Sequence, residues 1–161
     1  MKIFFFLSFF MSVSLWANSD VKKLLTLVNE RDYAMRTKNL SLAMKSFSKD
    51  IVWINSQGYY FKGFDSVKDL HNMMMTDKSR DYQYSIGKPL VKILDKNNAI
   101  VYYPWRMLWH TPQNISDVVF DEVGMMTLNA NKSSGHWKWV AITVQHTPCF
   151  YEAIEPVEIS H

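Results

Sequence analysis

The stretch that decides the fold is GHWKWVAITVQHTP, residues 135–148, near the C-terminal end of the chain. Side chains along an extended strand point alternately to its two sides. Counted from Trp137, one side carries Lys138, Val140, Ile142, Val144 and His146, and the other carries Trp137, Trp139, Ala141, Thr143 and Gln145. Both sides are partly apolar. We therefore expect a strand that is covered on both faces rather than one that faces water on one side.

The first seventeen residues, MKIFFFLSFFMSVSLWA, have the pattern of a secretory signal peptide. Lys2 precedes an apolar run, and the small residue Ala17 closes it, so cleavage is expected before Asn18. The run is shorter than the ~20 residues that span a bilayer. We therefore predict an exported protein, periplasmic or secreted, with no membrane segment once residues 1–17 are removed.

The rest of the chain is predicted to hold one domain, residues 18–148, and a C-terminal tail, residues 149–161. The formal net charge is +3 and no cluster of Lys and Arg is present, so nothing indicates a nucleic-acid partner. Cys149 is the single cysteine, so it cannot form an internal disulfide, and we expect a buried thiol. The sequence has no phosphate-binding glycine loop, no dinucleotide-binding glycine pattern and no H-E-x-x-H motif, so we expect neither a cofactor nor a metal.

Three helices are predicted in the N-terminal half. The first is expected to begin at Asp20, as an N-cap, and to carry an apolar stripe of Val21, Leu24, Leu25, Val28 and Met35. A short second helix follows Asn39, another N-cap. The third lies in DSVKDLHNMMM, where Ser66 and Asp69 have the spacing of a capping box, and its apolar side holds Val67, Leu70, His71 and Met74.

Strands are predicted in the remaining segments. Ile51–Asn55 and Tyr59–Lys62 form a hairpin around the turn at Gly58. From Asp81 onward four long strands follow one another, in YQYSIGKPLVKIL, AIVYYPWRMLWH, ISDVVFDEVGMMTLNA and the opening stretch. Short turns between them predict an antiparallel meander, in which Pro104 requires an edge position or a bulge. Helices followed by a meander indicate an α+β domain with the helices on one face of the sheet.

This order of elements resembles the nuclear-transport-factor-2-like superfamily, in particular its SnoaL-like, ketosteroid-isomerase-like and kinase-association-like branch. The resemblance is carried by Ala34, Asn39 and SKDIVWI at the entry to the first strand, by QGYYFKGFDSV with its glycines 58 and 63, and by the closing GHWKWVAITVQHTP. It covers nearly all of residues 20–148. Because this fold hosts many unrelated functions, the resemblance is informative about the fold and much less about activity.

The resemblance implies three N-terminal helices packed on a strongly curved antiparallel sheet that forms a cone-shaped pocket. The outer face of such a sheet commonly forms a homodimer. In the closing strand, the aliphatic face of Val140, Ile142 and Val144 would then line the core, with His146 at its end. Trp137, Trp139 and Thr143 would face a partner subunit or an ordered tail, since exposed tryptophans usually mark an interface.

Three residues are candidates for proton transfer. Asp121 and Glu122 are adjacent in the third long strand, so one of them points toward the helices, and the apolar neighbours do not decide which. His146 is a candidate base or hydrogen-bond donor because histidine titrates near neutral pH. For the acids, the competing interpretations are a bulge that places both at the sheet rim and an ion pair between one of them and Arg106. For His146, it is a histidine bonded only to a turn or to water.

Aromatic side chains are the candidates for ligand binding, because small-molecule pockets have aromatic walls with a few polar groups. The predicted ligand-binding residues are Tyr33, Trp53, His71, Tyr103 and Trp105. His71 also shares a helix side with Met74 and Met75, a combination that suits Cu(I). Methionine is a common core filler, however, so we predict core packing rather than a metal site.

Two functions follow from these features. The first is an exported protein that binds a small apolar or aromatic molecule in the pocket, as a homodimer. The alternative is an enzyme of the isomerase or cyclase type, with a pocket carboxylate as the proton shuttle and His146 or Tyr103 as oxyanion donor. Whether the chain is an enzyme stays open at the level of the sequence.

Overall fold

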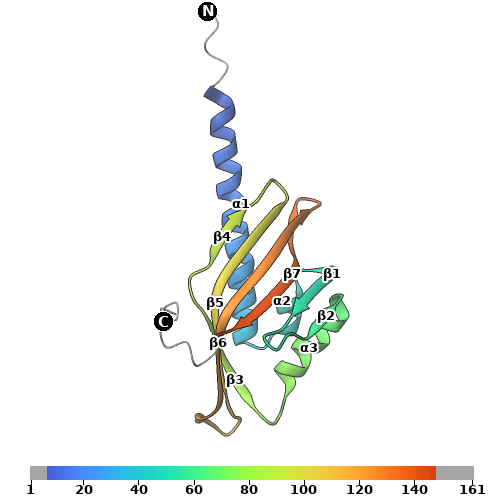
Figure 1. Cartoon of the computed structure of the whole chain (residues 1–161), viewed down its shortest axis with the longest axis vertical. Coiled ribbons are helices and arrows are strands. Elements are labelled where there is room, and N and C mark those ends of the chain that lie inside the picture. Colours follow the sequence, from blue (N-terminus) through green and yellow to red (C-terminus); the bar gives the residue numbers. More distant parts are fainter. Residues whose placement is uncertain (1–6, 148–161) are drawn as a thin grey trace, which may run out of the picture.

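The computed structural model describes residues 7–147, with side chains from residue 18 onward (Figure 1). The described residues form three helices and seven strands in the order α1 (Leu7–Arg36), α2 (Leu40–Met44), β1 (Phe47–Ile54), β2 (Tyr60–Lys62), α3 (Phe64–Thr76), β3 (Asp81–Ile86), β4 (Leu90–Ile93), β5 (Asn98–Thr111), β6 (Asn114–Ser133) and β7 (His136–His146). The predicted α+β class, with its helices ahead of the long strands, is confirmed.

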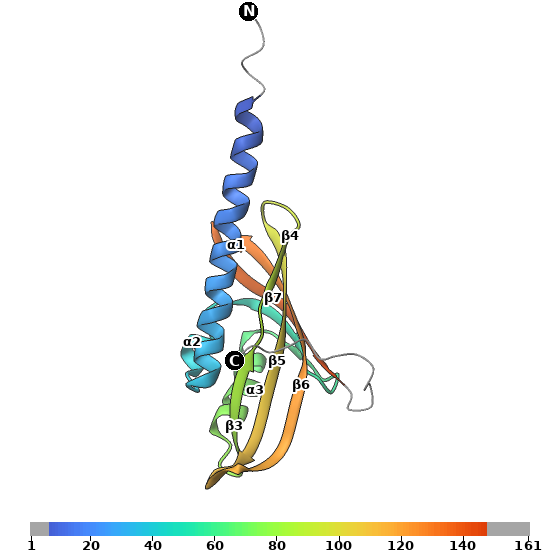
Figure 2. The ribbon, with the colours of Figure 1, turned by 90° about the vertical axis from the view of Figure 1, so that its left-hand side faces the viewer.

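All seven strands belong to one sheet with the order β2-β1-β7-β6-β5-β3, and β4 also pairs with β5. The pairing of β1 with β7 is parallel, whereas the other pairs are antiparallel. The sheet is therefore mixed and not strongly curled, which corrects the prediction of a strongly curved, purely antiparallel sheet. The helix α1 lies along one face of the sheet (Figure 2).

Helix starts were predicted with mixed success. Asn39 caps α2 as expected, because its Oδ1 accepts a hydrogen bond from the Leu42 amide at 3.0 Å. The predicted capping box at Ser66 is wrong, since α3 already begins at Phe64 and its N-cap is Gly63, with a φ of 87° and no side-chain cap. Gly63 takes this left-handed conformation without the steric cost that another residue would meet.

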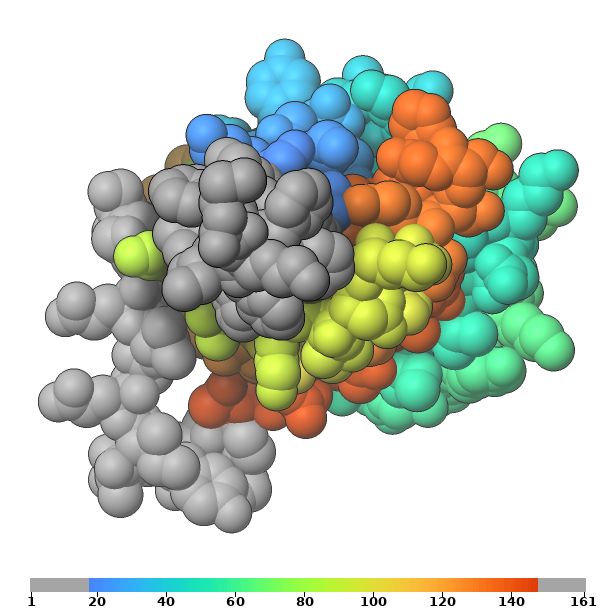
Figure 3. All heavy atoms as spheres, turned by 90° about the horizontal axis from the view of Figure 1, so that it is seen from above, coloured from blue at the N-terminus to red at the C-terminus, as the bar shows by residue number. Residues whose placement is uncertain are grey.

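Asp20 is not an N-cap, because α1 begins at Leu7 and runs past it. The Asp20 side chain is buried and instead accepts hydrogen bonds from Lys132 Nζ and, at 3.2 Å, from Trp137 Nε1. These contacts join α1 to the β6–β7 end of the sheet, which lies beside the helix when the molecule is seen from above (Figure 3). The Lys132 hydrogen bond and charge lower the pKa of Asp20, although burial opposes them.

The segment predicted as one strand before the turn at residues 95–98 is divided into β3 and β4. Both pair with β5, and Pro104 of β5 lies opposite the break between them. The Gly87 amide donates to the Pro104 carbonyl at 2.9 Å, and a Cβ on Gly87 would clash with the Pro104 ring. Pro104 is therefore accommodated in an interior strand, which corrects the predicted edge position or bulge.

A β-bulge in β7 changes the predicted faces of the closing strand. Trp139 pairs with Ala130 and Ala141 pairs with Asn129, so Val140 is an extra residue that shifts the alternation by one position. Trp137 and Trp139 therefore share the inner face with Ile142 and Val144, and Trp139 is completely buried. The predicted exposure of the two tryptophans to a partner subunit is wrong for this reason.

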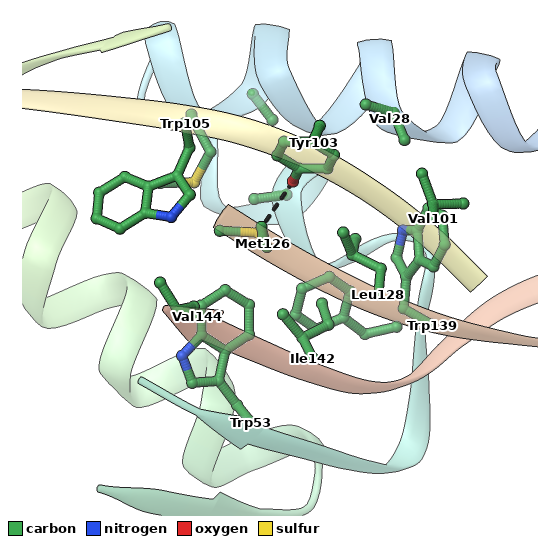
Figure 4. Close-up of a cluster of buried hydrophobic side chains, with 14 of the residues drawn as sticks. Val28, Trp53, Val101, Tyr103, Trp105, Met126, Leu128, Trp139, Ile142 and Val144 are labelled. Atoms are coloured by element: carbon green, nitrogen blue, oxygen red, sulfur yellow. Dashed lines mark hydrogen bonds between the residues drawn. The ribbon is translucent and has the colours of Figure 1, made fainter. Parts of the chain in front are cut away.

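The core lies between the helices and the inner face of the sheet (Figure 4). Odd-numbered residues of β5 and even-numbered residues of β6 point into it, including Tyr103, Trp105, Met126 and Leu128. No helix among the described residues is long and apolar enough to cross a membrane. Residues 7–17 of the predicted signal peptide continue α1 as backbone, and Cys149 with the predicted tail 149–161 lies outside the described residues.

Candidate functional site

A cavity of about 370 Å³ lies between α1, α3, the β1–β2 turn and the inner face of the sheet. Aromatic and methionine side chains make most of its walls, and a small number of polar groups reach it. Its lining includes Arg31, Met35, Trp53, His71, Met74, Asp77, Arg80, Tyr84, Trp105, Met107, Trp109, Phe120, Glu122, Met126 and Val144. An apolar pocket with a few convergent polar groups is the usual form of a small-molecule site.

Three of the five predicted ligand-binding residues line this cavity, namely Trp53, His71 and Trp105. Tyr103 lies in the core behind the lining, where its hydroxyl donates to Met126 Sδ at 3.0 Å, the dashed contact in Figure 4. Tyr33 is on the outer side of α1 and is 55% exposed, so the structure does not bring it to the cavity.

The two adjacent acids are separated by the sheet. Asp121 points outward and forms an ion pair with Arg106, with Nε–Oδ1 and Nη2–Oδ2 distances of 2.9 and 2.8 Å. Glu122 lines the cavity and accepts a hydrogen bond from Trp109 Nε1 at 2.8 Å. His146, the third proton-transfer candidate, stacks on Phe120 with ring centroids 6.1 Å apart. It is beside the lining and makes no hydrogen bond to Glu122.

Arg31 is the functional candidate that the sequence analysis missed. Only 2% of this residue is exposed, and it projects from α1 toward the cavity between α3 and β3. Its position continues the buried stripe of Leu24, Val28 and Met35 at helical spacing. A charged residue inside an apolar stripe was therefore the sequence signal, because arginine is almost never fully buried without a partner.

The contacts of Arg31 involve no negative charge. Nη1 is 3.5 Å from the Tyr84 hydroxyl, and Nη2 is 3.5 Å from His71 Nε2. The guanidinium carbon is 5.3 Å from the centre of the Trp53 ring, a cation–π distance. Nε has no hydrogen-bond partner. No ion pair among the described residues involves Arg31, and the neighbouring Asp32 is instead paired with Arg36 at 2.8 Å.

His71 is neutral in this environment. Burial and the nearby Arg31 charge lower its pKa to about 3. Nδ1 lies 2.8 Å from the Val67 carbonyl and so carries the proton, which leaves Nε2 as the acceptor that faces Arg31. Neither ring nitrogen is free for a metal, and no group of three or more His, Cys, Asp or Glu residues in the described part could hold one.

The mouth of the cavity is more exposed and carries paired charges. Arg80 Nε donates to Asp77 Oδ2 at 2.9 Å, and the Arg80 guanidinium lies 4.5 Å from the centre of the Trp109 ring. Phe120, also at the mouth, is half exposed. Burial therefore increases from these residues toward Arg31. We call Arg31, His71 and Tyr84 together the cavity floor.

A larger groove of about 1390 Å³ lies between α1, α2 and the β6–β7 turn. Its charged side chains are not buried. Lys45 is within 3.5 Å of Glu30, and Lys138 donates to the Lys45 carbonyl at 2.6 Å. These groups already have partners or face solvent, so the smaller cavity with the unpaired Arg31 is the better candidate for a specific site.

No protein-family model matches this chain, and no curated protein matches its sequence. Solved structures match its fold. The chain is similar to a type 2 hexachlorocyclohexane dehydrochlorinase, LinA, with a TM-score of 0.72 and 10% identity over 84% of this chain and 90% of that chain. It is similar to a putative scytalone dehydratase from Novosphingobium aromaticivorans, with a TM-score of 0.69 and 12% identity over 82% and 87% of the two chains.

A third similar structure is an NTF2-like protein of unknown function from Pseudomonas putida, with a TM-score of 0.67 and 16% identity over 89% of this chain and 94% of that chain. Other matches are described as having a cystatin-like fold. The chain therefore has the nuclear-transport-factor-2-like, or cystatin-like, fold that the sequence resemblance predicted. At these identities the likeness establishes the fold, and the function has to be argued from the cavity.

Proposed function

We propose that this protein binds a small apolar or aromatic molecule in the cavity between α1, α3 and the sheet. The observation that carries the proposal is the lining itself, in which Trp53, Trp105 and Trp109 surround a space of about 370 Å³. The same lining contains Arg31, His71 and Tyr84, polar groups that can orient a ligand. The resemblance also implies that the pocket is cone-shaped, and we include that shape in the proposal.

The test is recovery of the ligand. Protein purified without denaturation from its native source is analysed by native mass spectrometry, and the released small molecule is identified. The proposal predicts a bound aromatic or apolar compound that a Trp105→Ala variant no longer retains. Thr26→Ala, on the exposed side of α1, is the matched control and should retain it. A wild-type protein that binds no small molecule from native extracts contradicts the proposal.

An isomerase or cyclase type of enzyme is the second candidate, and Glu122 is the observation that favours it. Its carboxylate faces the cavity, and enzymes such as the LinA dehydrochlorinase have similar structures. The hydrogen bond that Glu122 makes is to Trp109, and no described tyrosine or histidine bonds to it. Ligand binding is therefore the function that the cavity supports better than catalysis. Turnover of the recovered ligand that is lost in Glu122→Gln with binding intact would establish the enzyme instead.

Export and dimer formation complete the proposal. The apolar segment 1–17 supports export, and the test is the N-terminal sequence of the mature protein, expected to begin at Asn18. The outer sheet face supports a homodimer, because it carries partly exposed apolar side chains on neighbouring strands, among them Tyr102, Leu108, Val123 and Met125. Apolar side chains that remain partly exposed on a sheet face are a feature of many interfaces.

A further inference from the structure

We propose that the ligand of this cavity carries an anionic group, a carboxylate in particular, that binds the guanidinium of Arg31 at the cavity floor. The inference rests on the proposed binding function and adds the chemical class of the ligand, an aromatic carboxylic acid. It follows from a buried positive charge that the protein itself leaves without a counter-ion.

The side chains around Arg31 place no negative charge in direct contact with its guanidinium. The guanidinium is charged at every physiological pH. Burial raises the pKa of the Tyr84 and Tyr103 hydroxyls, so both stay protonated, and His71 is neutral. Asp32 is engaged with Arg36. No ion pair of the described residues includes Arg31, so its charge is uncompensated by direct contact.

The donor geometry also leaves room for a carboxylate. Both Nη atoms reach their protein acceptors only at 3.5 Å, and Nε has no partner. Arginine binds carboxylates through two parallel N–H···O bonds, which these weakly used donors can supply. The Tyr84 hydroxyl lines the same floor and can donate to the bound group as well. The Trp53 ring lies against the guanidinium at a cation–π distance and does not neutralise its charge.

The distribution of charge along the cavity orients the ligand. Glu122 lies on the wall near the mouth, bonded to Trp109, and would repel an anionic group placed there. At the mouth Arg80 is already paired with Asp77, so it offers less attraction than Arg31. The anionic end is therefore directed to the floor, and the aromatic body lies between Trp53, Trp105 and Trp109.

The experiment compares matched acids and amides by calorimetry at neutral pH. Three pairs are used, benzoate and benzamide, 2-naphthoate and 2-naphthamide, and 2-anthroate with its amide. Since Arg31 recognises the charge and the apolar body is the same within a pair, we expect the best acid to bind at least about tenfold more tightly than its amide. Arg31→Met should abolish that preference, whereas Arg106→Met, a control on the outer face of the sheet and away from the cavity, should retain it.

The outcomes separate this inference from the proposed function. If the amides bind as tightly as their acids, the proposal of an anionic ligand is wrong, whereas the proposed binding of aromatic molecules stands. A protein that binds neither member of any pair overturns the proposed aromatic site as well. If Arg31→Met does not fold, Arg31→Gln, which keeps a polar side chain and removes the charge, is measured in its place, and the acid preference should be lost in it as well.

Discussion

Nη2 of Arg31 lies 3.5 Å from Nε2 of His71, and this contact joins α1 to α3 at the floor of the cavity. His71 is held in one tautomer by the Val67 carbonyl, so it presents a neutral acceptor to the guanidinium. A neutral acceptor satisfies one donor without cancelling the charge. The pair therefore positions a cation inside an aromatic cavity and keeps it available, which is the feature on which the proposed ligand class depends.

Replacing Arg31 should stabilise the empty protein. The buried guanidinium has no carboxylate partner, so Arg31→Met removes an uncompensated charge and keeps a side chain of similar length. We expect the free energy of unfolding in urea to rise by about 1–4 kcal/mol, the range for apolar replacement of buried ionic groups. Ligand binding should fall in the same variant, since sites for function often cost stability.

The matched control is Arg106→Met. Arg106 lies on the outer face, is paired with Asp121, and both side chains are about 40% exposed, as their fractions of 39% and 41% indicate. Exposed ion pairs contribute little, so a change within about 1 kcal/mol is expected. If the free energy of unfolding instead falls further in Arg31→Met than in Arg106→Met, Arg31 is a structural residue rather than a ligand-binding one.

The stability of the protein should depend on pH through His71. Its pKa is about 3 in the folded protein and has the ordinary value of 6.5 in the unfolded chain. Between these values the unfolded chain binds one more proton, so stability rises with pH and falls on acidification from 6.5. Each pH unit should cost ~1.4 kcal/mol in this window.

The measurement is urea unfolding at several pH values between 4 and 6. In this range His71 is protonated in the unfolded chain and neutral in the folded protein. His71→Gln retains a polar side chain and has no group that titrates there, so the slope of its stability against pH should be smaller by about 1.4 kcal/mol per pH unit. Equal slopes for the variant and the wild type would show that His71 is protonated in the folded protein.

Trp139 should behave as a core residue and not as an interface residue. It is completely buried on the inner side of the bulge at Val140. Trp139→Ala should lower the free energy of unfolding by about 3–5 kcal/mol at every protein concentration. Thr143→Ala, on the outer side of the same strand, should cost much less. A loss that grows as the protein is diluted would instead indicate that Trp139 contributes to a subunit contact.

The bulge in β7 is the feature of the fold that the sequence did not predict. Helical periodicity predicted that three helices form, although two of their starts were wrong, and the Asn39 cap and the hairpin at Gly58 were predicted correctly because those signals are local. The alternation in β7 was counted from Trp137 as if unbroken, and one extra residue, Val140, reversed the result for both tryptophans. A bulge is set by the pairing with β6, so the strand alone does not reveal it.

Similar reasons explain what was found and missed in the site. Trp53 and Trp105 line the cavity because they lie on the buried side of regular strands, and their role in ligand binding stays a prediction. Tyr33 was assigned to the cavity although its place on the helix faces outward. Arg31 was overlooked since its partners come from α3 and β3, far away in the sequence. Its position in an apolar stripe was the available signal.

The outer sheet face should mediate dimer formation. Val123 and Met125 of β6 lie there and are partly exposed, opposite Arg106 and Pro104 of β5. Val123→Glu places a charge in the middle of this surface and should convert a dimer to a monomer, as judged by light scattering at micromolar concentration. Asn29→Glu adds the same charge on the exposed side of α1 and should leave the dimer intact. A wild-type monomer at these concentrations would contradict the proposed homodimer.

The most direct test of the central claim is a crystal structure of the protein with 2-naphthoate. The account predicts the naphthalene rings between Trp53 and Trp105 and both carboxylate oxygens within hydrogen-bonding distance of Arg31. The control is Arg31→Met under the same conditions, where we expect the cavity to be empty or the ligand to be reoriented. A wild-type cavity that holds only water, or a ligand with its carboxylate turned away from Arg31, would contradict the account.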